Sequence, residues 1–421
     1  MPSRALFRNR VFRRVWAGEA LSGLGDLAFE VAFLWLVLEH TGSPALLAAV
    51  LVVQAVPRGV LMLLGGAVTD RVSPRTVLLA CHLVRAAAVL ALGAASAAGQ
   101  VHTWQFFALG LAAGAAEAFS VPAGGSILPQ LVPHDDLARA NAWVGFGEQG
   151  GRLAGPVLGG ALVVWAGTAT AAWFNAATFL AAAAAIASVP RRQPAAERPA
   201  PAADGGPGAA GTGSALRRDI TAGLAYARRS RDVRTVLLLV GAATLSYAGL
   251  FAVGLPALAA TYPDGPMTLG LLVSAWGLGQ LLGSAAAAAT GLPERWGLLI
   301  VGMTLTEGAA FAVLGFAPTA WGAAALLAML GFGVAYSSDV ALPTYVQTRT
   351  PPEYLGRVNS VIYLPRVVLE PVSVALMGVV VAAGVRWGFA AAAVPMLAVG
   401  LLLAADPRAR GLRTTPTAEP G

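Results

Sequence analysis

The chain has 421 residues, of which 57% are hydrophobic and only 12% are charged, and its mean hydropathy is +0.69. Soluble domains carry about 25% charged residues, so a water-soluble globule of this size would lack the polar surface that keeps it dispersed. The composition excludes a typical cytosolic enzyme. It also excludes a largely disordered chain, because disorder needs low hydrophobicity. It indicates an all-α membrane protein with many spans.

The net charge is +7, and all 28 basic residues are Arg. These Arg residues lie in short segments between apolar runs, whereas a nucleic-acid surface needs them gathered together. Cys81 is the single cysteine, and the four His residues have no partner at metal-ligand spacing. No phosphate-binding loop or hydrolase motif occurs. We therefore expect no metal, no cofactor, no catalytic residues and no nucleic-acid partner.

A bilayer-spanning helix needs about 20 mainly apolar residues, and twelve such runs follow one another along the chain. The first six lie near 15–38, 45–67, 76–97, 104–128, 140–165 and 170–189. The next six lie near 234–259, 267–290, 296–316, 320–346, 357–383 and 387–405. This arrangement predicts a six-helix bundle over 1–189 and a second six-helix bundle over 234–421.

Residues 190–233 separate the two sets of runs. Their first part, from Pro190 to Ser214, is rich in Pro, Gly and Ala and predicts a flexible tether. Behind it, Leu216, Ile220 and Leu224 recur every four residues and predict an amphipathic helix. This helix either lies on the membrane surface or packs on the bundle.

The distribution of Arg predicts the orientation. If the N-terminus is inside, 23 Arg fall in cytoplasmic segments, whereas Arg386 is the only one in an outside loop. Cytoplasmic loops of membrane proteins carry an excess of Lys and Arg. Both termini are therefore expected in the cytoplasm.

A repeat relates the two halves. The pattern P-x-x-x-L-x-R-x-N begins at Pro133 and again 218 residues later. With the same offset, Glu148 aligns with Arg366 in the sequence, and Arg152 aligns with Glu370. Each half thus has an acid and an Arg four residues apart on one helical face. Charges at membrane depth normally face a bundle interior or water. We expect these four to line a central cavity, each acid paired with the Arg of its own half or of the other half; the alternative is two local pairs that neutralise themselves during insertion.

The spans hold seven acids and four Arg, so three carboxylates have no basic partner. Such a group tends to keep a proton, which it can exchange for a cation. Asp26 and Glu30 share one face of the first span, and two such close carboxylates titrate as a pair; we expect them to couple transport to protons. The alternative is that Asp26 is a structural partner of Arg58 or Arg85, the other basic residues at depth. The further candidates for proton coupling are Glu117, Glu307 and Asp339.

Two motifs carry a resemblance to a known family. The stretch "GGAVTDRVSPR" is similar to the loop motif of the major facilitator superfamily at Gly66, Asp70, Arg71 and Arg75, and departs from it at Ser73 and Pro74. The fifth span matches a motif of that superfamily's drug-exporting antiporters, in which glycines allow close helix packing. The matching positions are Gly151, Gly155, Pro156, Gly159 and Gly160.

The stretches "GSILPQLVPHDDLARANA", "FNAATF" and "VPRGVLMLLGG" resemble the branch that contains macrolide-efflux and enterobactin-exporter-like proteins. The resemblance implies two six-helix bundles that rock about a midplane site. It also implies that the loop at Asp70 latches the cytoplasmic side of the cavity closed. It further implies that the chain acts as a monomer in a bacterial plasma membrane and uses the proton gradient to export an amphipathic drug or metabolite. The alternatives are a siderophore exporter that uses Arg58, Arg152 or Arg366, and a non-transporting sensor or scaffold.

Overall fold

The computed structural model describes residues 8–133, 136–190, 231–290, 296–336 and 352–411, and every regular element in these ranges is a helix. The N-terminal bundle consists of α2 (Arg10–Thr41), α3 (Pro44–Arg71), α4 (Pro74–Ala97), α5 (Thr103–Leu131) and α6 (Leu137–Ala187). The C-terminal bundle consists of α8 (Arg231–Gly249), η2 (Leu250–Gly254), α9 (Leu255–Ala259), α10 (Gly265–Thr290), α11 (Trp296–Leu314), α12 (Ala320–Val334), α14 (Pro352–Ala383), α15 (Val385–Ala405) and α16 (Pro407–Arg410).

All twelve apolar runs coincide with described helices, and nine stretches are long and apolar enough to cross a bilayer by length and composition. The tenth run is helical to Val334, and its part beyond 336 lies outside the described residues. The tether and the amphipathic helix within 190–233 fall almost wholly outside them as well. The all-helical membrane fold is thus confirmed.

The fifth and sixth runs form one helical segment, α6, which is broken at Gly167. Its backbone there has φ 81° and ψ 165°, a conformation that is open to glycine and strained for other residues. Residues on both sides of the break pack against α2: Ala28 lies against Gly159, and Asp26 accepts a bond from Asn175. Gly167 therefore allows the chain to reverse with no loop.

Several helices begin where a side chain caps the first turn. The Asn9 side chain accepts hydrogen bonds from the backbone N–H groups of Val11 and Phe12. Ser73 accepts one from Thr76 N–H, and Pro74 follows it at the first helical position. Serine before proline is a strong helix start. The two departures from the family's loop motif therefore form the start of α4.

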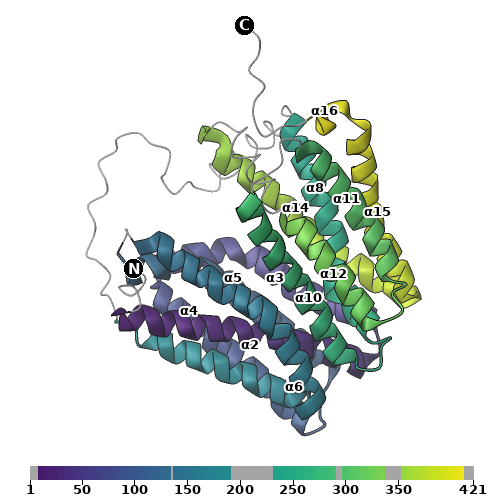
Figure 1. The fold of residues 1–421 in the computed structure, drawn as a ribbon. Coiled ribbons are helices and arrows are strands. Elements are labelled where there is room, and N and C mark those ends of the chain that lie inside the picture. Colours follow the sequence, from purple (N-terminus) through teal and green to yellow (C-terminus); the bar gives the residue numbers. More distant parts are fainter. Residues whose placement is uncertain (1–7, 134–135, 191–230, 291–295, 337–351, 412–421) are drawn as a thin grey trace.

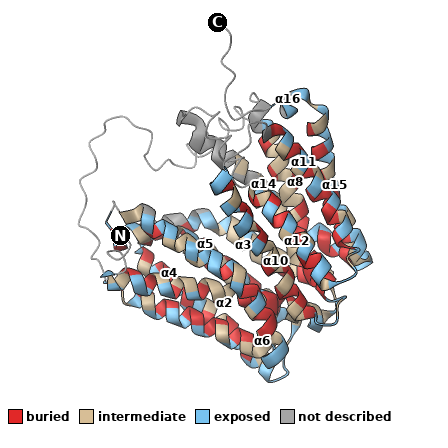
Figure 2. Cartoon of the chain, viewed as in Figure 1, coloured by how far each residue is buried: buried red, intermediate tan, exposed pale blue. Residues whose placement is uncertain are grey.

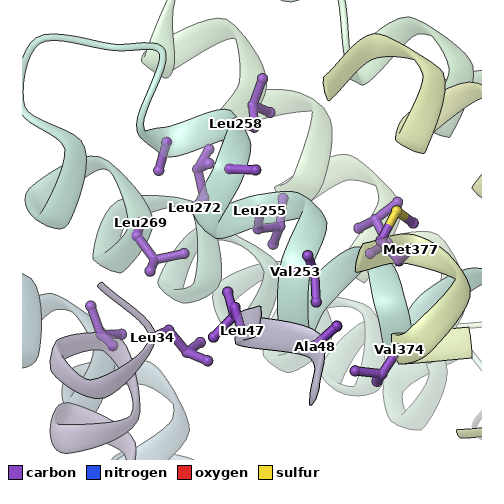
Figure 3. Packing of buried hydrophobic residues seen from close by; sticks show 14 of the residues in the cluster. Leu34, Leu47, Ala48, Val253, Leu255, Leu258, Leu269, Leu272, Val374 and Met377 are labelled. Carbon is purple, nitrogen blue, oxygen red and sulfur yellow. The ribbon is translucent and has the colours of Figure 1, made fainter. Parts of the chain in front are cut away.

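The two bundles meet at one end and spread apart toward the end that carries the N-terminus and α16 (Figure 1). The contacts between them run mainly from α6 to α10 and from α3 to α14. Figure 3 shows the apolar core at this junction, where Leu34 and Leu47 of the N-terminal bundle face Leu255, Leu269 and Val374 of the other bundle.

Large apolar side chains cover the outward faces of the helices, where many residues are exposed (Figure 2). Four tryptophans between 65% and 80% exposed lie beside the connections at the end where the bundles meet: Trp104, Trp165, Trp321 and Trp387. Tryptophan concentrates at the membrane–water interface, where its ring is apolar and its N–H is solvated. This ring of tryptophans indicates where one interface of the bilayer lies.

The seventh span contains a π-helical turn, η2, between α8 and α9. Pi-turns are rare and are frequently found at functional sites. Leu250 and Val253 in this turn are fully buried, whereas Phe251 lines a cavity between the bundles. The turn thus lies at the boundary between core and cavity.

Candidate functional site

A cavity of about 490 Å³ lies between the two bundles and takes side chains from α2, α3, α4, α5, α6, α8, η2, α10 and α14. Most of its wall is apolar, and its aromatic side chains are Phe29, Phe33, Phe179 and Phe251. Its charged side chains are Asp26, Glu30, Arg58, Arg85, Glu117 and Glu370. Four carboxylates and two guanidinium groups give this wall a formal excess of two negative charges.

Arg85 is held on one side of the cavity by Asp26 and an aromatic ring. Its Nη2 lies 2.9 Å from Asp26 Oδ2, and its guanidinium carbon lies 4.5 Å from the centre of the Phe179 ring. Asn175 Nδ2 donates to the other oxygen of Asp26 at 3.4 Å. The alternative in which Arg85 is the structural partner of Asp26 is confirmed.

Arg58 is shared by two carboxylates from different parts of the chain. Its Nη1 lies 3.4 Å from Glu117 Oε1 on α5, and its Nη2 lies 2.6 Å from Glu370 Oε1 on α14. Each of the three side chains is about one-third exposed, which fits groups on a cavity wall. The bond to Glu370 crosses from one bundle to the other.

Close packing of α3 on α5 brings Arg58 to Glu117. A Cβ atom at Gly114 would overlap the backbone carbonyl of Gln54, so a larger residue there would push α3 away. Arg58 is one helical turn beyond Gln54, and Glu117 is about one turn beyond Gly114. The short approach at Gly114 therefore sets the distance at which the two charges meet.

Glu30 has a different environment from the other three carboxylates of the cavity. Its side chain is exposed to the cavity and makes no hydrogen bond or ion pair with any residue that the structure describes. Glu30 is thus a carboxylate that is open to a ligand.

The pairing expected from the repeat is wrong. Glu370 pairs with Arg58 instead of Arg366 or Arg152, and neither Glu148 nor Arg152 forms an ion pair with a described residue. Of the four repeat positions, Glu370 alone is among the described residues that line the cavity. The repeat relates positions by sequence symmetry, whereas the cavity wall depends on which face of each helix is packed.

Of the two remaining proton-coupling candidates, the structure describes only Glu307. Glu307 on α11 is 3% exposed, accepts a bond of 2.8 Å from the Tyr247 hydroxyl, and is not among the described cavity residues. Tyr247 packs against Phe251, which does line the cavity. Asp339 lies outside the described residues.

The loop motif lies at the end of α3 and the start of α4. Arg75 donates to the carbonyls of Val189 and Ala187 at 2.8 Å, so in this structure it binds the end of α6 within its own bundle. Arg71 is exposed, and the surroundings of Gly66 and of the Asp70 side chain lie outside the described part. The role of this loop as a latch stays a prediction.

The glycine motif of α6 faces two neighbours. Gly151, Gly155 and Gly159 pack against the segment of α2 around Leu24 to Ala28. Gly160 packs against Pro266 of α10, and the Pro156 carbonyl lies against Gly270 on the same helix. The motif therefore brings one face of α6 close to α2 of its own bundle and the adjacent face close to α10 of the other bundle.

Several wall residues were not expected from the sequence, and three of them are polar or lie against Arg85. Gln54, Asn175 and Phe179 all line the cavity. An uncharged amide inside an apolar span is a signal that was available for the first two. Asn175 and Phe179 also belong to the stretch "FNAATF", which carried part of the family resemblance.

Several known proteins are similar in sequence to most of this chain. The chain is 28% identical over 399 residues to the multidrug efflux pump Tap of Mycolicibacterium fortuitum, covering 93% of this chain and 94% of that protein. It is 22% identical to macrolide efflux protein A of Streptococcus pyogenes, covering 83% and 84%. It is 26% identical to the enterobactin exporter EntS of Shigella boydii, covering 75% and 72%.

Among solved structures, a bacterial homologue of the iron transporter ferroportin in an inward-facing state has the same fold. Its TM-score is 0.67 at 14% identity, over 94% of this chain and 98% of that one. Residues 15–366 match the sequence pattern of the Major Facilitator Superfamily. With this match, the two bundles and the cavity between them, the chain belongs to the Major Facilitator Superfamily of membrane transporters.

Proposed function

We propose that this chain exports an amphipathic small molecule, a drug or secondary metabolite that is cationic or neutral, in exchange for protons. The observation that carries the proposal is the charge arrangement of the cavity. Both guanidinium groups of the described wall are held by carboxylates, while Glu30 has no partner among described residues. The efflux pumps among its relatives support export as the direction.

The cavity suits a ligand with an apolar body and a basic group. Its volume of about 490 Å³ is within the 300–1,000 Å³ range of small-molecule sites. The phenyl rings of Phe29, Phe33 and Phe251 offer apolar contact, and an aromatic face also attracts a cation. A ligand ammonium at Glu30 would reduce the formal negative excess of the wall from two charges to one.

Proton coupling follows if the same carboxylate takes either a proton or the ligand's charge. Asp26 and Glu30 are one turn apart on α2, and both line the cavity. With Asp26 engaged by Arg85, Glu30 is the member of the pair that we expect to exchange its proton for the substrate. Binding of one cation then excludes the other, which is the requirement for exchange.

For its setting, we propose that the chain acts as a monomer in a bacterial plasma membrane, with both termini in the cytoplasm. The Arg-rich segments support this orientation by the positive-inside rule. Under it, the end where the bundles spread apart faces the cytoplasm. The cavity would then receive substrate from inside the cell.

A siderophore exporter is the second candidate, and the enterobactin exporter among the relatives favours it. An anionic siderophore would need a guanidinium group that is available in the cavity. Arg58 and Arg85 are each bound to a carboxylate in this structure. The cavity therefore favours a cationic or neutral cargo over an anionic one.

The test is the accumulation of cationic, neutral and anionic compounds by an efflux-deficient bacterium that expresses the chain, with and without a protonophore. We expect cells that express the chain to accumulate less of the cationic or neutral compounds than cells without it. This difference should disappear when the protonophore is added or when the chain carries Glu30→Gln. Glu148→Gln is the matched control, because Glu148 is exposed and lies outside the described cavity wall. Protonophore-insensitive export, or full export by Glu30→Gln, would contradict the proposal.

A further inference from the structure

The Arg58–Glu370 contact is the one ion pair between the bundles among the described residues. It joins side chains 312 positions apart, and its N···O distance of 2.6 Å is that of a strong charge-assisted bond. It lies on the cavity wall, near the middle of α3 and of α14. Any movement that separates α3 from α14 must break it.

Arg58 also binds Glu117 at a longer distance of 3.4 Å, within the N-terminal bundle. One guanidinium group therefore serves two carboxylates, and the group of three has a formal charge of −1. If Glu370 is neutralised, Arg58 can turn wholly to Glu117 without losing its charge compensation. Neutralisation of Glu370 therefore removes the contact between the bundles and leaves the contact within the N-terminal bundle in place.

We propose that Glu370 is a positioning residue that holds the empty transporter in this arrangement through its ion pair with Arg58. Either cargo, a proton or a cationic group of the substrate, displaces Arg58 from Glu370 and so releases the transporter from this arrangement. The inference rests on the proposed exchange of a cation for protons. It adds the element by which binding in the cavity is coupled to movement of the bundles.

This arrangement prevents futile cycling. With the cavity empty and Glu370 charged, the pair with Arg58 joins the bundles and opposes their rearrangement. Proton or substrate binding removes the pair, and the bundles can then rock. An exchanger needs this behaviour, since reorientation of an empty carrier would dissipate the gradient.

The electrostatic surroundings of Glu370 are simple. α3, α8, η2 and α15 pack against α14. Of their described side chains, Arg58 is the only charged one on the cavity wall, and Glu117 on α5 lies behind it. The other charged groups of the wall are Asp26, Glu30 and Arg85. Arg366 lies one turn away on α14 itself.

The test is a distance measurement that needs neither transport nor substrate. Cys81 is the only cysteine, so Cys81→Ser allows spin labels at Val72→Cys and Ala289→Cys, two exposed positions at the spread end of the two bundles. In the otherwise native chain we expect the long distance at pH 8 and a growing short-distance population as the pH falls. In Glu370→Gln we expect the short population to rise by about five- to thirtyfold at pH 8 and to vary little with pH.

Glu117→Gln keeps the pair between the bundles and is expected to retain both the long distance and its pH response. Arg58→Gln breaks the same pair from the other side and must reproduce the effect of Glu370→Gln, which covers the case in which one variant fails to fold. A distribution in Glu370→Gln with the native distances and pH response would overturn the proposal, as would an equal shift in Glu117→Gln. Because the measurement uses neither transport nor an organic substrate, a failure of the export assay and a failure of this inference are separate results.

Discussion

Replacement of Gly160 by Ala tests whether the bundles depend on close contact between α6 and α10. A Cβ atom at this position would lie 2.6 Å from the Pro266 carbonyl oxygen and 3.1 Å from the Met267 Cα. Ordinary contacts of a Cβ atom are 3.4–4 Å, and both neighbours are backbone atoms that cannot rotate away. The helices must therefore separate by several tenths of an ångström in a region packed as densely as a crystal.

Overpacking of this kind costs about 1–3 kcal/mol. The whole penalty falls on the arrangement in which the bundles touch at Gly160. The population of this arrangement, relative to the one with the short distance at the spread end, is therefore expected to fall by about 5- to 150-fold. Spin labels at the spread end of the bundles report this ratio directly. The variant is expected to populate the short distance at pH 8, where the native chain does not.

Gly159→Ala is the matched control, since the two positions are adjacent on α6. A Cβ atom at Gly159 would overlap the Ala28 carbonyl, which belongs to the same bundle. This strain is present in every arrangement of the bundles, so it should lower the unfolding temperature with little change in the distance distribution. If Gly160→Ala left the distribution unchanged, or if Gly159→Ala shifted it equally, the reasoning would be refuted.

Three further outcomes are expected. Arg85→Gln leaves Asp26 without its guanidinium partner and should destabilise the protein by about 1–3 kcal/mol, with recovery when Asp26→Asn is added; thermal unfolding in detergent measures both. Gly167→Ala places a side chain at φ 81° and should cost about 1–3 kcal/mol, also seen in unfolding. The Tyr262 hydroxyl donates to the Ala317 carbonyl at 2.8 Å, and burial raises the pKa of this phenol above its ordinary value. Tyr262→Phe should therefore lose about 1 kcal/mol below pH 10, and the difference from the native chain should vanish as the pH rises through the raised pKa.

The fold was predictable because the bilayer imposes one length on every span, and twelve apolar runs of that length stand out in the sequence. The spans predicted at 140–165 and 170–189 imply a reversal between them, but the sequence gives no sign that Gly167 makes it without a loop. In the same way, charges such as Asp26 and Glu117 were found because an acid in an apolar span is conspicuous. Their presence on the cavity wall agrees with the rule that such groups avoid lipid.

The pairing of Asp26 with Arg85 was among the alternatives that the sequence offered, whereas the pairing of Glu370 was not. Glu370 was expected to pair within the repeat, yet its partner is Arg58, which lies on a different helix of the other bundle. Which side chains meet depends on helix rotation and on how closely α3 and α5 approach at Gly114. Those quantities come from packing in three dimensions, and no spacing along the chain encodes them.

The π-turn from Leu250 to Gly254 makes the length of the seventh span a determinant of the cavity. A π-turn holds one residue more than the α-turn it replaces, and each residue of an α-helix turns the chain by about 100°. Removal of one residue, such as Ala252, would rotate the part of the span that precedes it, α8, relative to the part that follows it, α9. Either Phe251 would leave the cavity or Leu255 would leave the core. Insertions and deletions at this point therefore offer a route to a different binding surface without substitution of its aromatic or charged side chains.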